Sequence, residues 1–164
     1  MNPTKKFNTS NDLRYRGFRI SMFSQTQLNV KVDKKNHHNV NLISIQLDNQ
    51  INDNLYFATQ VSIAYNDFLG YPGYGELLAG IGIENKYIKS NNFQNFFQIL
   101  IGTNIHGVIL KPSISTNYNL NDSYAIYGQL GYTMSVNGLN LYKENRSFSN
   151  YNMGLGLSYR FSLE

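Results

Sequence analysis

The sequence predicts an all-β fold, a closed antiparallel eight-stranded up-and-down β-barrel that spans a membrane. Three observations predict it. Apolar and polar residues alternate with a period of two along stretch after stretch, which is a strand signal. The apolar faces carry no Asp, Glu, Lys or Arg, whereas the opposite faces do. The stretches are also long enough, because a tilted strand of about 9–11 residues crosses the hydrocarbon layer.

Residues 110–135 contain two of these strands and the turn between them. Even-numbered positions are mostly apolar, and odd-numbered positions are small or polar. Residues 121–123 have the sequence Asn-Asp-Ser, which supplies turn chemistry. A three-residue loop there pairs Tyr118 with Ile126, so the apolar faces of the two strands coincide.

The same alternation predicts the other strands. In chain order they are residues 16–32, 43–48, 54–65, 76–87, 97–105 and 151–161. Short connections are expected near residues 49–53, 91–93 and 121–123, and longer ones at 33–38, 67–74 and 136–149. The exception is His106-Gly107, a two-residue hairpin turn that pairs Ile105 with Val108. An even number of strands brings both termini to one rim, which we assign to the periplasmic side.

The composition indicates one domain and excludes several kinds of site. We expect a flexible tail or linker at residues 1–12, the barrel at 13–161 and a C-terminal extension at 162–164. The chain has no cysteine, which excludes disulfides and thiol chemistry. Its net charge of +4 comes from dispersed basic residues without a nucleic-acid motif. We expect no cofactor and no metal.

The distribution of charge separates a membrane barrel from a soluble one. A charged side chain that faces lipid at mid-membrane costs ~2–4 kcal/mol, so a charge-free face is a strong constraint there. A soluble, lipocalin-like binding barrel is the alternative, and it would place its charges outward in water. The predicted inward charges include Arg19, Asp48, Glu84 and Lys86.

The last predicted strand carries a resemblance. Its sequence Gly-Leu-Ser-Tyr-Arg-Phe, residues 156–161, resembles the C-terminal signature of bacterial outer-membrane barrels. Residues 127–132 are similar to the last hairpins of small OmpA/OmpX-type and opacity-type barrels. The resemblance covers residues 16–161 and implies a Gram-negative outer-membrane location. It also implies that Tyr159 and Phe161 are recognised by the barrel-assembly machinery, although residues 162–164 depart from the usual aromatic end.

An eight-stranded barrel has an interior that side chains just fill. We therefore expect ion pairs inside, Arg19 with Asp48 and Glu84 with Lys86, rather than an open pore. His106 is expected at a turn and no catalytic residue is assigned, although a lipid-modifying hydrolase that uses His106 remains an alternative.

Two loops carry basic residues. In a closed barrel the first strand adjoins the eighth, which places Lys34 and Lys35 beside Lys143 and Arg146 at one rim. Such a cluster could pair with lipopolysaccharide phosphates. The sequence thus favours a non-enzymatic surface or anchoring barrel in contact with outer-membrane lipids, whose work is done by its loops or by an upstream periplasmic domain. A lipid-modifying enzyme, a narrow channel and a soluble lipocalin-like barrel remain as alternatives.

Overall fold

The computed structural model describes residues 17–31, 37–52, 54–65, 74–85, 92–104, 107–135 and 149–162. They form β1 (Gly17–Lys31), β2 (His37–Gln50), β3 (Leu55–Ala64), β4 (Gly75–Asn85), β5 (Phe93–Asn104), β6 (Gly107–Asn119), β7 (Tyr124–Ser135) and β8 (Ser149–Ser162). Each strand pairs antiparallel with the next, and β1 also pairs with β8, which closes the barrel. The predicted closed eight-stranded barrel is confirmed.

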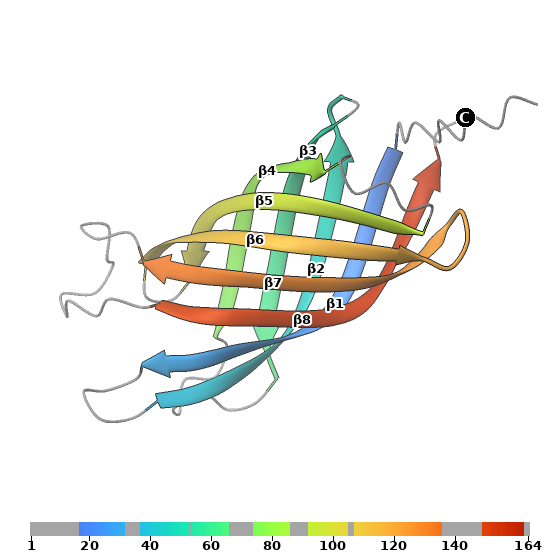
Figure 1. Ribbon diagram of the computed structural model, residues 1–164. Coiled ribbons are helices and arrows are strands. Elements are labelled where there is room, and N and C mark those ends of the chain that lie inside the picture. The colour runs from blue at the N-terminus through green and yellow to red at the C-terminus, as the bar shows by residue number, and fades with distance from the viewer. Residues whose placement is uncertain are drawn as a thin grey trace, which may run out of the picture.

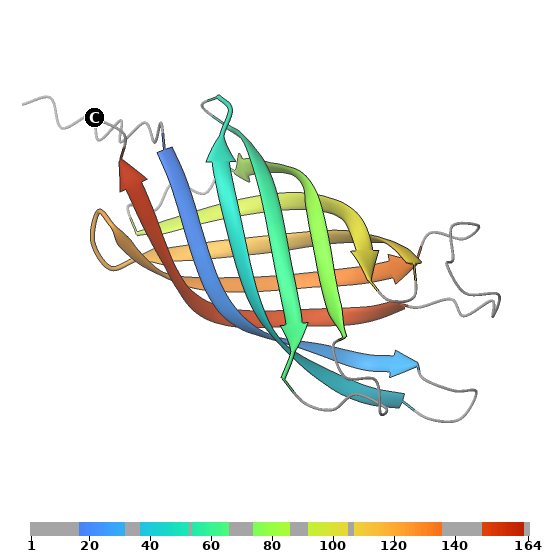
Figure 2. The ribbon, with the colours of Figure 1, turned by 180° about the vertical axis from the view of Figure 1, so that it is seen from behind.

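The strands pass around the barrel at a steep tilt. In Figure 1, β5–β8 cross the front while β1–β4 pass behind them, and Figure 2 shows the same crossing from behind. Gly17 pairs with Ser162, so the outer ends of β1 and β8 lie side by side. We call this end the terminal rim, and the opposite end the loop rim. Within the described ranges, no helix has the length and apolar character needed to cross a membrane.

Alternation along each strand sorts the side chains as predicted, with apolar ones outward. In β3 the outward Val61 and Ile63 are 47% and 60% exposed. The inward Gln60 and Ser62 are buried. Because successive side chains of a strand point to opposite faces, this pattern holds wherever the pleat is regular.

The turn between β6 and β7 forms as predicted. Asn121 Oδ1 accepts hydrogen bonds from the amides of Ser123 at 2.9 Å and Tyr124 at 2.7 Å. An Asn side chain that mimics a backbone turn in this way is a common turn device. Tyr118 pairs with Ile126, which confirms the predicted register.

The predicted turn between β5 and β6 is wrong by one residue. Asn104 pairs with Gly107, and Val108 pairs with Thr103 instead of Ile105. Gly107 has a φ of 128°, which non-glycine residues rarely adopt. The glycine therefore belongs to the first pair of β6 rather than to the loop. His106 lies outside the described residues.

The first hairpin also departs from the prediction. Alternation was expected to run unbroken along residues 16–32, but the register of β1 against β2 shifts between Gln27 and Val30. A shift of this kind inserts an extra residue into one strand and increases its twist. In addition, β2 (His37–Gln50) extends well beyond the predicted residues 43–48.

Pro112 interrupts the ladder between β6 and β7. Leu120 donates its amide to the Tyr124 carbonyl, so the even-numbered residues of β6 direct their amides toward β7. Proline has no amide hydrogen to donate. The pairing accordingly skips from Leu110 to Ser113 on β6. In a closed barrel without edge strands, this lost hydrogen bond is a local weak point in the sheet.

The interior contains an apolar cluster as well as polar groups. Ala58, Leu78, Leu100 and Ile109, from β3 to β6, are almost completely buried and pack together. The sequence prediction assigned the inside to polar residues, and this cluster corrects it. A lumen of this width is filled by whatever side chains point inward, so apolar residues there exclude water along one wall.

Candidate functional site

The outward side chains of β1–β8 form an apolar belt. Among the strand residues whose exposure is described, which leaves out 29–31, 37–38 and 162, the outward positions carry no Asp, Glu, Lys or Arg. Large side chains in the belt stand well exposed, with Leu130 at 63% and Leu155 at 67%. Soluble monomers rarely expose a continuous apolar surface of this extent. A lipid environment is the physical setting in which such a belt is stable.

Aromatic side chains border the belt at both rims. Toward the loop rim, Tyr132 and Tyr151 lie with ring centroids 5.1 Å apart. Toward the terminal rim, Tyr159 contacts Tyr124 at 5.0 Å and Phe161 at 4.7 Å. Tyr and Trp gather at membrane–water interfaces because one end of the ring is apolar and the other is wet. The two groups therefore mark the two boundaries of the belt.

The terminal half of the lumen is held by an ion pair. Arg19 donates to Asp48 Oδ2 from Nε at 2.9 Å and from Nη2 at 2.6 Å. Gln46 Nε2 donates to the other Asp48 oxygen at 2.8 Å. The guanidinium carbon of Arg19 lies 4.2 Å from the centre of the Phe96 ring. Both charged groups are thus buried with hydrogen-bonding partners, as burial of a charge requires.

A lysine occupies the middle of the lumen. Lys111 is fully buried, and its Nζ donates to Gln25 Oε1 at 2.8 Å and to Gln60 Oε1 at 3.3 Å. Elsewhere in the lumen, Phe23 and Tyr127 pack with their ring centroids 4.8 Å apart. Amide oxygens rather than a carboxylate therefore solvate this ammonium group.

The loop half of the lumen holds a buried carboxylate. Glu76 Oε1 accepts hydrogen bonds from Gln27 Nε2 at 2.5 Å and from the Tyr74 hydroxyl at 3.1 Å. Asn104 Nδ2 donates to the same hydroxyl at 3.3 Å. Buried polar contacts therefore occur in the terminal half of the lumen around Arg19, in its middle around Lys111, and in its loop half around Glu76.

The mouth at the terminal rim is nearly closed. Arg160 donates to the side-chain oxygens of Gln94 and Asn119. The recess beside Arg19 and Arg160 has a volume of about 20 Å³. A recess of this size holds roughly one water molecule. The inward side chains therefore occlude this end of the barrel.

The predicted interior pairs have different outcomes. Arg19 and Asp48 lie together, as their direct pairing across β1 and β2 requires. Glu84 is half-buried and accepts a hydrogen bond from the Tyr56 hydroxyl at 3.1 Å. Its predicted partner, Lys86, lies outside the described residues.

Of the predicted rim and assembly residues, the structure describes only the assembly residues. Lys34, Lys35, Lys143 and Arg146 all lie outside the described residues. Tyr159 and Phe161 point outward from β8 and are 36% and 44% exposed.

Sequence reasoning missed the central contacts of the lumen. Lys111 is an odd-numbered position on the polar face of residues 110–135, and the sequence indicated no partner for it. Gln25 lies on β1 and Gln60 on β3, neither of which pairs with β6. Alternation along each strand predicts that these three side chains point into the barrel. It does not predict how far apart they lie across the lumen.

No family model and no curated protein matches the sequence. Solved structures do match the fold. A de novo designed transmembrane β-barrel has a TM-score of 0.61 at 10% identity, over 89% of this chain and 96% of that one. Neisserial surface protein A has a TM-score of 0.61 at 9% identity, over 91% and 98%. The chain has the fold of a small eight-stranded transmembrane β-barrel.

One natural barrel among the matches is an outer-membrane protein of Yersinia pestis. Ail, the attachment invasion locus protein of Yersinia pestis, has a TM-score of 0.59 at 12% identity, over 90% of this chain and 100% of Ail. Another structure of Ail is a complex with the heparin analogue sucrose octasulfate. At these identities the comparisons show the fold of this chain, and they agree with the belt and aromatic borders of a transmembrane barrel.

Proposed function

We propose that this chain is a non-enzymatic outer-membrane barrel that acts as a surface or membrane-anchoring protein. The observation that carries the proposal is the charge-free apolar belt around a lumen filled with buried side chains. The belt holds such a barrel in the membrane, and the filled lumen leaves little space for transport. Contacts with other molecules are then made by the rims of the barrel and by any domain attached to them.

The filled lumen predicts an electrically silent barrel. After reconstitution in a planar bilayer, the protein should give the same current as a protein-free bilayer, because Lys111, Gln25 and Gln60 fill the middle of the lumen. Steady single-channel steps would contradict this proposal and favour a narrow channel. Cleaved or transferred acyl chains after incubation with lipid A or phospholipid would instead favour a lipid-modifying enzyme.

The loop rim is the proposed site of lipopolysaccharide contact. β1 and β8 pair as far as Leu28 and Tyr151, so the connection after β1 and the connection before β8 start from adjoining strands. The connection after β1 contains Lys34 and Lys35. The connection before β8 contains Lys143 and Arg146. The polyanion bound to Ail, a barrel of the same fold, supports an anionic ligand here. Phosphate groups form charge-assisted hydrogen bonds with such side chains.

Removing the four charges should weaken lipopolysaccharide binding without affecting folding. We expect the combined variant Lys34→Gln, Lys35→Gln, Lys143→Gln and Arg146→Gln to bind less tightly than the parent, because the phosphates lose their cationic partners. Added salt should weaken binding by the parent, since surface charges are screened beyond about 8 Å at physiological ionic strength. Lipopolysaccharide titration by calorimetry in detergent measures both effects.

The control is a variant with Lys5→Gln and Lys6→Gln, which lie in the segment before β1. It should bind as the parent does. Equal binding by the fourfold variant and the parent would eliminate the rim as a lipid site.

The terminal rim is the proposed site of contact with the barrel-assembly machinery and with a periplasmic domain. Tyr159 and Phe161 are the residues proposed for recognition by the barrel-assembly machinery, and both are outward on β8. Residues 1–12 are proposed as a linker, which would suit attachment to a periplasmic domain. An assembly assay with Phe161→Ala tests the first assignment, which normal assembly of the variant would contradict.

A further inference from the structure

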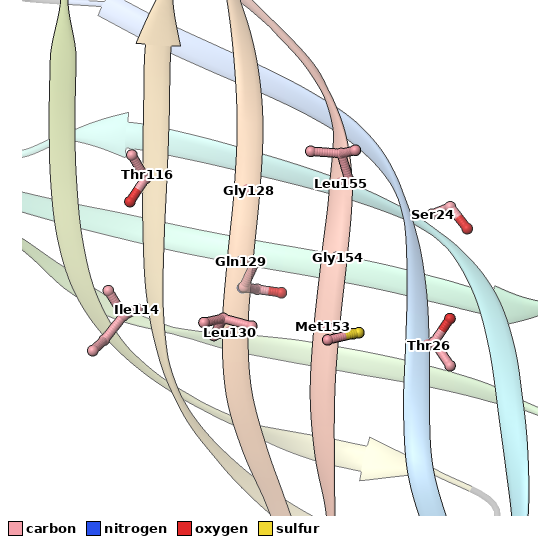
Figure 3. Close-up of a pocket in the computed structure, with 10 residues that line it drawn as sticks. All are labelled: Ser24, Thr26, Ile114, Thr116, Gly128, Gln129, Leu130, Met153, Gly154 and Leu155. Carbon is pink, nitrogen blue, oxygen red and sulfur yellow. The ribbon is translucent and has the colours of Figure 1, made fainter.

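A hollow of about 590 Å³ lies in the outer surface of the barrel. Figure 3 shows its lining side chains, which come from β6, β7, β8 and β1. They are Ser24, Thr26, Ile114, Thr116, Gly128, Gln129, Leu130, Met153, Gly154 and Leu155. The volume falls within the usual range for ligand pockets, about 300–1,000 Å³.

The hollow arises from small residues at neighbouring positions of the belt. Thr116 pairs with Gly128, Gly128 with Leu155, and Leu155 with Ser24, so these residues form one row across four strands. Three of the four are small. The adjoining row contains large side chains at the corresponding positions of β6, β7 and β8, namely Ile114, Leu130 and Met153. A row of small side chains beside large ones produces a depression in the belt.

The hollow lies midway between the two aromatic borders. On β7, Gly128 is equally far along the strand from Tyr124 and from Tyr132. On β8, Leu155 is equally far from Tyr151 and from Tyr159. Since aromatic borders mark the membrane interfaces, the hollow faces the centre of the hydrocarbon layer. Lipid headgroups do not reach this depth.

The hollow also offers few polar groups to a ligand. Thr26 Oγ1 donates to Asn41 Oδ1 at 2.9 Å, and Thr116 Oγ1 donates to Asn95 Oδ1 at 2.8 Å. Asn41 lies on β2 and Asn95 on β5, and neither residue lines the hollow. The two threonine hydroxyls therefore donate away from the hollow. Ser24 and Gln129 are the other polar residues of the lining, and Gln129 Nε2 donates to Ser113 Oγ at 3.3 Å inside the barrel, so the walls are mainly aliphatic.

We propose that the hollow is a binding site for one acyl chain of a membrane lipid. This rests on the proposed membrane location of the barrel. A flexible chain lying between the large side chains contacts them on several sides, whereas a chain against a smooth part of the belt contacts protein on one side. In hydrocarbon, van der Waals contact is the main source of such preference.

A second copy of this chain fits the hollow less well. A twofold dimer pairs a surface patch with the same patch on its partner. A hollow facing a hollow would leave a void between the copies, and voids forfeit packing contacts. An acyl chain can instead adapt its shape to the depression.

Filling the hollow provides the test. A Cβ added at Gly128 would have Thr116 O as its nearest neighbour, at 4.0 Å, so Gly128→Leu introduces a side chain without displacing the backbone. The matched control is Ala79→Leu. Ala79 is outward on β4, pairs with Thr59 and Ile101, and does not line the hollow.

Each protein is incorporated into phosphatidylcholine bilayers, transferred to a mild detergent and examined by native mass spectrometry. We expect the parent and Ala79→Leu to retain one phosphatidylcholine, and Gly128→Leu to lose it. Equal retention by the parent and Gly128→Leu would overturn the proposal. A lipid-free dimer of the parent would overturn it in favour of a contact between copies.

Flotation with the bilayers separates this proposal from the proposed function. A parent that floats with the bilayers but retains no lipid would overturn only the acyl-chain site. A parent that does not float would overturn both proposals. The Gly128→Leu variant must show the same strand content by circular dichroism as the parent, and Gly128→Ala, with a smaller added group, should retain the lipid partly.

Discussion

Replacing Asp48 with Ala should lower the free energy of unfolding by about 3–5 kcal/mol, because removing one member of a buried ion pair leaves the other charge uncompensated. Arg19 is 6% exposed and Asp48 is 1% exposed. Without Asp48, the guanidinium keeps the Phe96 ring as a neighbour but loses both of its short hydrogen bonds to a carboxylate. Urea unfolding in micelles, followed by circular dichroism, measures the change.

A double variant tests the cause. Arg19→Met with Asp48→Ala removes both charges, and it should be more stable than Asp48→Ala alone because no buried charge is left without a partner. If Asp48→Ala unfolds at the same urea concentration as the parent, Arg19 is solvated and the lumen is wetter than the structure indicates.

Replacing Gly156 with Val should destabilise the barrel where β8 meets β1. A Cβ at Gly156 would lie 2.0 Å from Met22 O and 2.5 Å from Phe23 Cα, which are backbone atoms of β1. Overpacking typically costs about 1–3 kcal/mol, and here we expect the upper end because the opposing atoms cannot rotate away. Gly80 and Gly102 face the backbone of a neighbouring strand equally closely.

Gly128→Val is the matched control, since its Cβ would meet no atom closer than 4.0 Å. Urea unfolding and heat-modifiable migration on a detergent gel compare the two variants. Gly156→Val should unfold at lower urea and give less of the compact form. Identical behaviour of the two valine variants would mean that β1 and β8 are not in close contact at this point.

The sequence was sufficient for the strand faces and for one hairpin. Alternation alone places Gln60 and Val61 on opposite faces, because successive side chains of a regularly pleated strand point to opposite sides of the sheet. Asn121 marked its turn through a local side-chain hydrogen bond. The β1 bulge and the start of β6 at Gly107 were missed, since both depend on how neighbouring strands share a register rather than on alternation.

The interior was predictable only where contacts are local to one strand pair. Arg19 and Asp48 face each other directly on β1 and β2, so opposite charges at paired positions indicated their contact. Lys111 reaches Gln25 and Gln60 across the lumen, and that approach depends on closure and tilt of the whole barrel. The outer hollow was missed because its small residues become neighbours only through the registers of four strands.

In a transmembrane barrel of this kind, one face of each strand meets lipid while the other fills the lumen. The chain has no cysteine, so single cysteines along β3 can each carry a nitroxide label in bilayers. Labels at Phe57 and Val61 should collide often with oxygen, which dissolves in hydrocarbon, and rarely with a water-soluble nickel complex. Labels at Ala58 and Gln60 should collide rarely with either. A label at the exposed turn residue Asn121 serves as the water-facing reference. Nickel collisions at Phe57 and Val61 as frequent as at Asn121 would mean that this face of β3 meets water instead of lipid.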